Sequence, residues 1–129
     1  MRASLPALML AAAVATVVLY GPALEGEFVW DDRAAVVNNR EARWDAAWAS
    51  LSSTDFWGQR LTLATSHKSW RPLTTLTYRL DNKLHGLEPR GYHLSNLVVH
   101  ALACCAACAV FARVVFRDRR DGGRAAAVA

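Results

Sequence analysis

The chain has 129 residues and a formal charge of +4, which is enough for one small domain. Its charged residues are unevenly placed: beyond Arg2 they lie in residues 25–90 and 113–124, and two windows of 22 residues carry no charge. Because the excess of basic residues flanks these windows, membrane topology accounts for the positive charge. Nucleic-acid binding is therefore not indicated. All three cysteines lie in the second window, which excludes a disulfide framework in residues 25–90.

The two uncharged windows, residues 3–24 and 91–112, are predicted to be transmembrane helices. About 20 apolar residues at 1.5 Å per residue span a bilayer, and backbone groups in lipid must bond within their own segment. Residues 1–2 and the tail 113–129 are basic, whereas the loop 25–90 balances nine basic against nine acidic residues. Both ends are therefore expected to be cytoplasmic, the loop lumenal or extracellular, and the Ala- and Arg-rich tail disordered.

The first window has an alternative interpretation as a cleavable signal peptide. Arg2, the apolar stretch Leu5–Tyr20 and the small residues Gly21 and Ala23 fit such a peptide. The apolar stretch is longer than usual, and Pro22 lies between the two small residues, so a retained signal anchor is favoured. The fold class is then an all-α membrane protein, with two spanning helices flanking a loop of short helices.

Two helices are predicted in the loop. Residues 34–51 place large apolar residues on one face, either at the membrane interface or against the loop itself, and residues 52–55 break the pattern. A second helix is expected to begin at Pro72, because proline suits a first helical turn. The residues with helical spacing are Val37, Trp44, Trp48 and Leu51 in the first helix and Leu73, Leu76, Leu80 and Leu84 in the second.

Asp31 and Asp32, directly after the first window, are the candidate catalytic acids. Adjacent carboxylates could act as a general base, a metal ligand or a substrate clamp. The structural alternative is an acidic turn in water, or an N-cap of the helix that follows. The residues themselves do not decide between these interpretations.

His67, Lys68 and Arg71 form a candidate phosphate-binding group. Arginine can bind phosphate bidentately, lysine adds a point charge, and the helix expected at Pro72 would add backbone amides. The alternative is a loop whose Lys68 and Arg71 pair with lipid headgroups or with Asp55.

The second window carries polar or small residues at every fourth position. A metal or haem site at His100 and the cysteines is one interpretation, but packing against other helices is more usual for such a stripe. No metal site is therefore predicted. Polar groups facing lipid are costly, so further helices, from a longer chain or a partner, are expected to cover the stripe. It consists of Tyr92, Asn96, His100, Cys104 and Cys108.

These motifs resemble the N-terminal region of one family, the transmembrane and tetratricopeptide-repeat (TMTC-type) O-mannosyltransferases of the endoplasmic reticulum, which modify cadherins. The resemblance covers roughly residues 25–110, and its weaker half is shared with bacterial multispanning repeat proteins. It rests on Phe28–Asp32, Asp55–Gly58, the run 66–79 and Gly86–Leu94 with Asn96 and His100.

The resemblance implies the N-terminal part of a GT-C glycosyltransferase fold in the endoplasmic reticulum membrane, with residues 25–90 lumenal. It implies dolichyl-phosphate mannose as donor substrate and Ser or Thr of a secretory-pathway protein as acceptor. Asp31 or Asp32 would then deprotonate the acceptor, and His67, Lys68 and Arg71 would bind the donor phosphate. No cofactor or obligatory metal is implied, although Asp31 and Asp32 are chemically able to bind a divalent ion.

The later membrane helices and the repeats of that family have no counterpart in these 129 residues. A lipid-linked donor needs a groove between several helices, so the chain alone is expected to be an inactive N-terminal part of a mannosyltransferase. The alternative is a non-catalytic two-span membrane subunit or adapter.

Overall fold

The computed structural model describes residues 4–125, with side chains as far as residue 114. Within that range the regular structure is helical, apart from one antiparallel bridge between Thr54 and Arg60. The chain divides into two compact units, residues 1–23 with 96–129 (the hairpin unit) and residues 24–95 (the loop unit).

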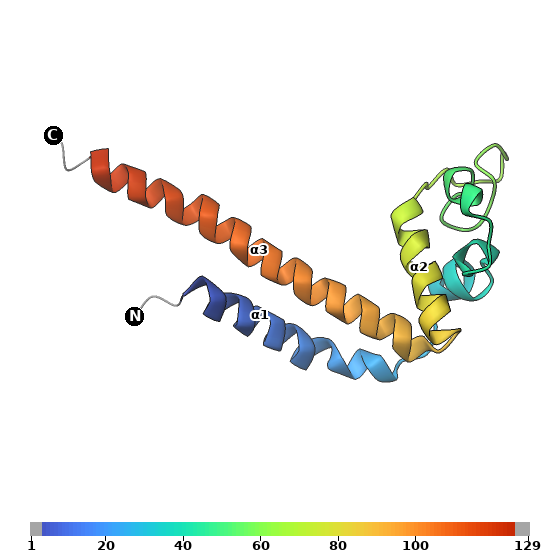
Figure 1. Ribbon diagram of the computed structural model, residues 1–129, viewed down its shortest axis with the longest axis horizontal. Coiled ribbons are helices and arrows are strands. Elements are labelled where there is room, and N and C mark those ends of the chain that lie inside the picture. Colours follow the sequence, from blue (N-terminus) through green and yellow to red (C-terminus); the bar gives the residue numbers. More distant parts are fainter. Residues whose placement is uncertain (1–3, 126–129) are drawn as a thin grey trace. The chain divides into compact units, whose positions relative to one another are not determined.

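The hairpin unit pairs two long helices. Helix α1 (Leu5–Tyr20) continues as a 3-10 turn, η1 (Gly21–Glu25), and α3 (Pro89–Ala125) contributes its length from Asn96 onward. The two helices lie side by side and run antiparallel (Figure 1). Two contacts join them: the Cys105 thiol donates to the Met9 carbonyl oxygen at 3.4 Å, and the rings of Tyr20 and His100 meet edge to face with centroids 4.9 Å apart.

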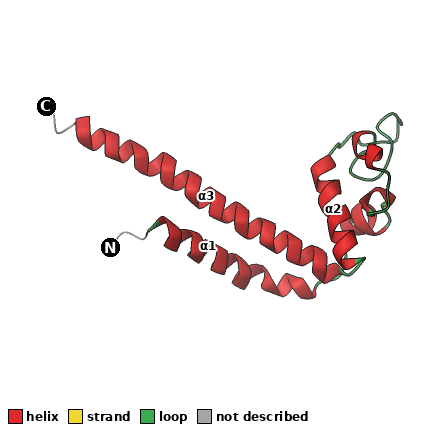
Figure 2. Ribbon diagram, viewed as in Figure 1, coloured by secondary structure: helices red, strands yellow, loops and turns green. Residues whose placement is uncertain are grey.

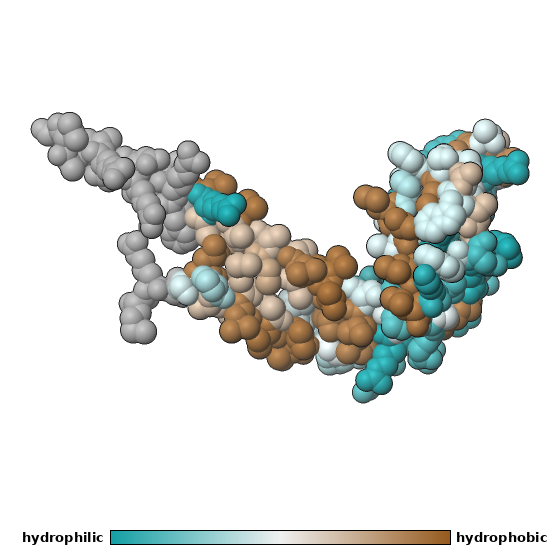
Figure 3. Space-filling view, in the orientation of Figure 1, coloured by the Kyte–Doolittle hydropathy of each residue, from teal (hydrophilic) through white to brown (hydrophobic). Residues whose placement is uncertain are grey.

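Both helices present apolar side chains outward. The segments Leu5–Glu25 and Pro89–Val114 are long and apolar enough to cross a membrane, which agrees with the predicted windows 3–24 and 91–112. Leu19 and Phe111 are 72% and 68% exposed, and Figure 3 shows apolar surface along this unit. Such a surface is typical of helices solvated by lipid.

Helix α3 is longer than the predicted span. It continues through Arg113 to Ala125, where the sequence analysis expected a disordered tail. The five arginines of this extension favour a helix, whereas Gly122 and Gly123 oppose one, so helix propensity alone does not account for the extension. Residues 1–3 and 126–129, which include the predicted cytoplasmic N-terminus and the end of the tail, lie outside the described residues.

The loop unit contains four helical elements and a long irregular stretch. The elements are a π turn η2 (Arg33–Val37), the 3-10 turns η3 (Arg40–Ala42) and η4 (Trp48–Ser52), and the helix α2 (Pro72–His85). Residues 53–71 form loops between η4 and α2 (Figure 2). A small core holds the unit together: Ala35, Val36, Phe56 and Tyr92 are buried, and Phe28, Trp57 and Tyr78 pack against them.

Helix α2 confirms the prediction of a helix beginning at Pro72. Proline at the first position loses no intrahelical hydrogen bond. The helix ends where Gly86 adopts a φ of 62° with a ψ of −120°, a conformation that favours glycine because it has no Cβ.

The prediction of one helix over residues 34–51 is wrong. The structure divides this segment into η2, η3 and η4. Asn39 interrupts it by accepting a hydrogen bond from the Glu41 amide, at 2.9 Å, as the cap of η3. In addition, the Arg79 guanidinium binds the carbonyl oxygens of Glu41, Ala46 and Ala47. A continuous helix would use such carbonyls for its own hydrogen bonds.

Candidate functional site

Asp31 and Asp32 belong to a tight turn that gives them different surroundings. The Asp32 amide donates to the Val29 carbonyl oxygen at 2.9 Å, and the Asp32 carboxylate accepts a hydrogen bond from the Val29 amide at 3.2 Å. Asp32 precedes η2 but does not cap it with its side chain, contrary to the N-cap interpretation. Asp31 is exposed, and its carboxylate makes no hydrogen bond within residues 4–114. Asp32 therefore holds the turn, and Asp31 presents its carboxylate to solvent.

Trp30 occupies a strained position in the same turn. Its φ is +43°, in the left-handed region, and its side chain is 91% exposed. A bulky residue with positive φ is uncommon and costs of order 1–3 kcal/mol. The surrounding hydrogen bonds, including one of 3.2 Å from the Arg33 amide to the Trp30 carbonyl oxygen, maintain this conformation.

Tyr78 is a half-buried side chain of α2 that packs on the same aromatic ring as Arg71. Burial raises the pKa of Tyr78; the negative charge of Asp32 raises it further, and the positive charge of Arg71 opposes the rise. The Arg71 guanidinium lies 4.7 Å from the centroid of the Phe56 ring, and Tyr78 packs on the same ring with centroids 6.0 Å apart. Tyr78 was not identified as a site residue from the sequence.

The three predicted phosphate-binding residues are engaged differently. Arg71 is exposed and its guanidinium contacts an aromatic face. His67 is exposed, with its ring 6.3 Å from that of Trp57. The Lys68 ammonium donates to the carbonyl oxygens of Leu61 and Leu63, the latter at 2.5 Å, and its backbone has a φ of 57°. Lys68 thus closes its own loop, which leaves the side chains of His67 and Arg71 available to a ligand.

Asp55 organises the irregular stretch that carries His67 and Arg71. Its side chain is buried and accepts hydrogen bonds from the Trp57 amide at 3.0 Å, the Gln59 amide at 2.9 Å and the Ser66 hydroxyl at 2.6 Å. Burial alone would raise the pKa of Asp55, but these bonds, together with the His67 amide, hold it below its ordinary value. Asp55 pairs with neither Lys68 nor Arg71, so the predicted alternative of such pairs is wrong.

A buried contact between Asn39 and Gly58 fixes the other end of this stretch. The Asn39 amide group donates to the Phe56 carbonyl oxygen at 3.0 Å. Gly58 has a φ of +82°, and a Cβ added there would overlap the Asn39 side-chain oxygen. Glycine is therefore required at this position on both conformational and steric grounds.

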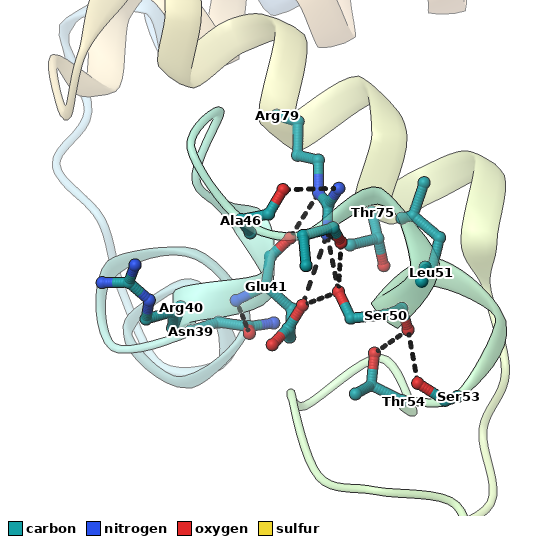
Figure 4. Close-up of polar contacts among 12 residues, drawn as sticks. Asn39, Arg40, Glu41, Ala46, Ser50, Leu51, Ser53, Thr54, Thr75 and Arg79 are labelled. Atoms are coloured by element: carbon teal, nitrogen blue, oxygen red, sulfur yellow. Dashed lines mark hydrogen bonds and ion pairs between the residues drawn. The ribbon is translucent and has the colours of Figure 1, made fainter.

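Arg79 is the most deeply buried charge of the loop unit. It is 0% exposed, and its guanidinium forms an ion pair with Glu41 at 3.3 Å and a hydrogen bond with the Ser50 hydroxyl at 3.0 Å. Figure 4 shows it projecting from α2 toward the segment 39–54, where it also binds three backbone carbonyl groups. Arg79 anchors η3 and η4 to α2. Its role was missed from sequence because arginine on a helix is usually solvated.

The C-terminal end of α2 is fastened to the first turns of α3, within the loop unit. The Ser95 hydroxyl donates to the buried Asp81 carboxylate at 2.5 Å, and the Tyr92 hydroxyl donates to the Gly86 carbonyl oxygen at 3.0 Å. Burial raises the pKa of Asp81, and the Ser95 hydrogen bond and His85 partly offset the rise. Tyr92 also packs edge to face on Phe28, with centroids 5.2 Å apart. Tyr92 therefore contacts both Phe28, three residues before Asp31, and Gly86, at the end of α2.

The described residues give no support to a metal site. No group of three or more His, Cys, Asp or Glu side chains within them could hold an ion. His100 contacts Tyr20, and the three cysteines are free and half-buried in α3. A shallow concavity on the hairpin unit is lined by Ala13, Val14, Val17 and Val18 of α1, which are all apolar and unsuited to a sugar phosphate.

The loop unit therefore presents the exposed carboxylate of Asp31 and the exposed guanidinium of Arg71. A carboxylate of this kind can accept a proton, and a guanidinium can neutralise an anionic oxygen. Both face open solvent. The sequence predicted both as site residues, and their roles stay predictions; it did not indicate the buried polar contacts of Asp55, Arg79, Asn39 and Asp81.

Comparison with known proteins agrees with the resemblance seen in the motifs. The chain is 42% identical over 86 residues to the protein O-mannosyl-transferase TMTC4 of Homo sapiens, covering 66% of this chain and 12% of that protein. It is 40% identical over 107 residues to TMTC1 of Mus musculus, covering 81% and 11%, and 42% identical over 91 residues to Tmtc3 of Drosophila melanogaster, covering 70% and 10%.

No protein-family profile matches the chain, and no solved structure matches it. The chain spans about a tenth of the length of the curated relatives it matches. Identities near 40% over most of the chain indicate common ancestry. The chain is therefore a homologue of the TMTC protein O-mannosyl-transferases over most of its own length.

Proposed function

We propose that this chain supplies the acceptor-activating part of a protein O-mannosyltransferase. The homology to the TMTC proteins supports the reaction class. The observation that carries the proposal is the difference between the two adjacent acids: Asp32 is used by its own turn, whereas Asp31 is exposed and free of partners within residues 4–114.

In the proposed mechanism, the loop unit faces the lumen of the endoplasmic reticulum and the donor is dolichyl-phosphate mannose. Asp31 accepts the proton of a Ser or Thr hydroxyl while the oxygen of that hydroxyl forms the new bond to C1 of mannose. The bond from C1 to the phosphate oxygen breaks, and dolichyl phosphate leaves as an anion. Arg71, with His67, stabilises the charge that develops on the phosphate. A phosphate is a stable leaving group, so the mechanism uses neither a general acid nor a metal ion.

The remainder of the site is proposed to come from further transmembrane helices, in a longer chain or in a partner. Asn96 is exposed on α3 inside the apolar segment Pro89–Val114. A polar side chain that faces lipid is costly, so a neighbouring helix that hydrogen-bonds to Asn96 would be stabilising. The same helices would complete the groove for the lipid-linked donor.

The test is mannosyl transfer by the longest protein that carries this segment, with dolichyl-phosphate mannose and an acceptor protein. Asp31→Asn is expected to lower kcat by about a hundredfold or more, the usual contribution of a positioned base. Asp32→Asn is expected to have a smaller effect, through the turn. Asp45→Asn is the matched control, because Asp45 is another exposed carboxylate of the loop unit (its side chain is 71% exposed). Normal transfer by Asp31→Asn would refute the assignment of the base.

A further inference from the structure

Trp30 differs from the other tryptophans of the loop unit, because no contact holds its ring. It is 91% exposed, and within residues 4–114 its side chain makes no hydrogen bond and no contact with another ring. The indole of Trp30 is therefore not part of the packing that stabilises the loop unit. Each of the other four packs on an aromatic ring or donates to a carbonyl oxygen: Trp44 and Trp48 on each other, Trp57 on Phe56, and Trp70 to Leu51.

The backbone of Trp30 is held in a conformation that its side chain disfavours. Its φ is +43°, a region in which glycine and asparagine are the residues more usually found. Hydrogen bonds on both sides fix the turn: the Asp32 amide donates to the Val29 carbonyl oxygen, and the Arg33 amide donates to the Trp30 carbonyl oxygen. A small polar residue would fit this turn at lower energy. A bulky residue that is strained and also exposes its ring is typical of a ligand contact.

The neighbour of Trp30 in the chain limits which ligand the ring can take. Asp31 is exposed, its carboxylate has no partner within residues 4–114, and the Cα atoms of consecutive residues are about 3.8 Å apart. An acyl chain or an apolar protein surface on Trp30 would also lie close to the ionised Asp31 and deprive it of water, which is costly. A ligand that is apolar toward the indole and has hydroxyl groups at its edge satisfies both residues.

A hexose has this distribution of groups. In mannopyranose the hydrogens of C3 and C5 point to one side of the ring and give it an apolar face. The axial hydroxyl of C2 points to the other side, and the remaining hydroxyl groups project from the edge. The face of an indole ring carries partial negative charge, and the C–H groups of a sugar carry partial positive charge, so stacking of the two is favourable. The hydroxyl groups remain available to a carboxylate and to water.

We propose that Trp30 binds the mannosyl ring of the lipid-linked donor by stacking on its C–H face. The inference rests on the proposed function, because the proposed function names the donor. The phosphate of the donor is bound separately by Arg71, so Trp30 contributes to the affinity for the sugar and not to the affinity for the phosphate. One turn of the loop unit then carries both the residue that binds the sugar and Asp31, the proposed base.

The proposal is tested by donor binding to the longest protein that carries this segment, a measurement that does not require transfer. The probes are citronellyl phosphate mannose, a short-chain analogue of the donor, and citronellyl phosphate, which has the same chain and phosphate but no sugar. Trp30→Asn removes the ring and suits a positive φ, whereas Trp30→Phe keeps an aromatic face. The control is the same pair of substitutions at Trp48, which is also exposed (56%) but lies in η4.

Trp30→Asn is expected to weaken the binding of citronellyl phosphate mannose by about tenfold, the size of a good aromatic contact, and to leave the binding of citronellyl phosphate unchanged. Trp30→Phe should lose less, and the Trp48 variants should bind both compounds as the wild-type protein does. The free energy of unfolding should stay the same or rise in Trp30→Asn, because the strain at a φ of +43° is relieved.

Three results would overturn the proposal. The first is equal affinity of the wild-type protein for the two compounds, or an unchanged affinity of Trp30→Asn for the mannosyl compound. The second is an equal loss of affinity for both compounds in Trp30→Asn, which would assign Trp30 to a contact with the citronellyl chain or with the membrane. The third is a fall in the free energy of unfolding of Trp30→Asn, which would assign Trp30 a structural role.

Mannosyl transfer by Asp31→Asn separates this proposal from the proposed function. If Asp31→Asn transfers mannose normally and sugar binding still requires Trp30, the assignment of the base fails and the stacking contact stands. If Asp31→Asn abolishes transfer and Trp30→Asn binds the mannosyl compound normally, the stacking contact fails and the proposed function stands.

Discussion

Each of the two units is stabilised internally in a different way. The loop unit buries polar groups whose hydrogen bonds are satisfied internally, above all Arg79, Asp55 and Asn39. The hairpin unit carries apolar side chains that are mostly exposed, and among its described residues few are buried: Thr16 and Leu97. A lipid environment supplies the packing that the hairpin unit lacks. The loop unit instead depends on individual side chains, so single substitutions should affect it strongly.

All five tryptophans of the chain lie in the loop unit. Tryptophan fluorescence therefore reports unfolding of this unit separately from the hairpin unit. Chemical denaturation in a mild detergent, followed by this signal, provides the measurement for the stability predictions below.

The largest effect is expected from Arg79→Ala. The substitution leaves Glu41 without its ion-pair partner and frees three carbonyl groups. Removing one partner of a buried ion pair costs about 3–5 kcal/mol. The matched control is Arg40→Ala, because Arg40 also pairs with a carboxylate, that of Asp45, but these two side chains are 75% and 71% exposed. Equal losses of stability in both variants would break the comparison.

Gly58→Ala is expected to have the next largest effect. An alanine there meets the Asn39 side chain and must also adopt a φ of +82°. Gly86→Ala separates the two causes, since Gly86 has a φ of +62° and open space around it. Left-handed strain alone costs about 1–2 kcal/mol. A loss for Gly58→Ala no greater than that for Gly86→Ala would show that the Asn39 contact relaxes freely.

Two buried carboxylates are expected to make stability depend on pH in opposite directions. The pKa of Asp55 is lowered from 3.8 in the folded state. Its contribution to the free energy of unfolding is therefore present above the unfolded-state pKa and is lost as the pH falls through the folded-state pKa. The pKa of Asp81 is raised from 3.8 in the folded state. Its contribution to the free energy of unfolding is therefore present below the unfolded-state pKa and is lost as the pH rises through the folded-state pKa.

Denaturation between about pH 3 and pH 6, around the ordinary carboxyl pKa, checks these signs. Asp55→Asn should weaken the loss of stability in acid, and Asp81→Asn should weaken the loss of stability on going toward neutral pH. Identical pH profiles for the wild-type chain and both variants would contradict the assignment of these two carboxylates.

The smallest effect on stability is expected from Asp31→Asn. Asp31 is exposed and makes no hydrogen bond within the described side chains, and substitutions at such sites usually leave stability unchanged within about 0.5 kcal/mol. Asp32→Asn should cost more, since it weakens the hydrogen bond to the Val29 amide. A clear destabilisation by Asp31→Asn would show that Asp31 is structural and would weaken its role as the proposed base.

The sequence predicted those features that depend on local pattern. The two apolar windows and the helix at Pro72 follow from composition and from one proline, and the structure contains them. The helix over residues 34–51 failed because Arg79, far along the chain, competes for its carbonyl groups. The hydrophobic periodicity of a short segment carries no information about a hydrogen-bond donor far along the chain.

The candidate site residues stay predictions. Asp31, Asp32 and Arg71 were proposed from their chemistry and from the resemblance to a family. Asp32 differs from Asp31 because its carboxylate accepts a hydrogen bond from the Val29 amide. The Lys68 ammonium is held by hydrogen bonds to two carbonyl oxygens of its own loop. Both depend on backbone geometry, which residue types alone do not specify.

The contact between Arg79 and Glu41 spans 38 residues. During synthesis the chain grows from its N-terminus, so residues 40–52 emerge well before the arginine that organises them. This segment must remain unfolded until α2 follows, and contacts of such long sequence separation form slowly. A ribosome stalled before residue 79 would therefore hold a segment that proteases can cut, and release beyond α2 would protect it.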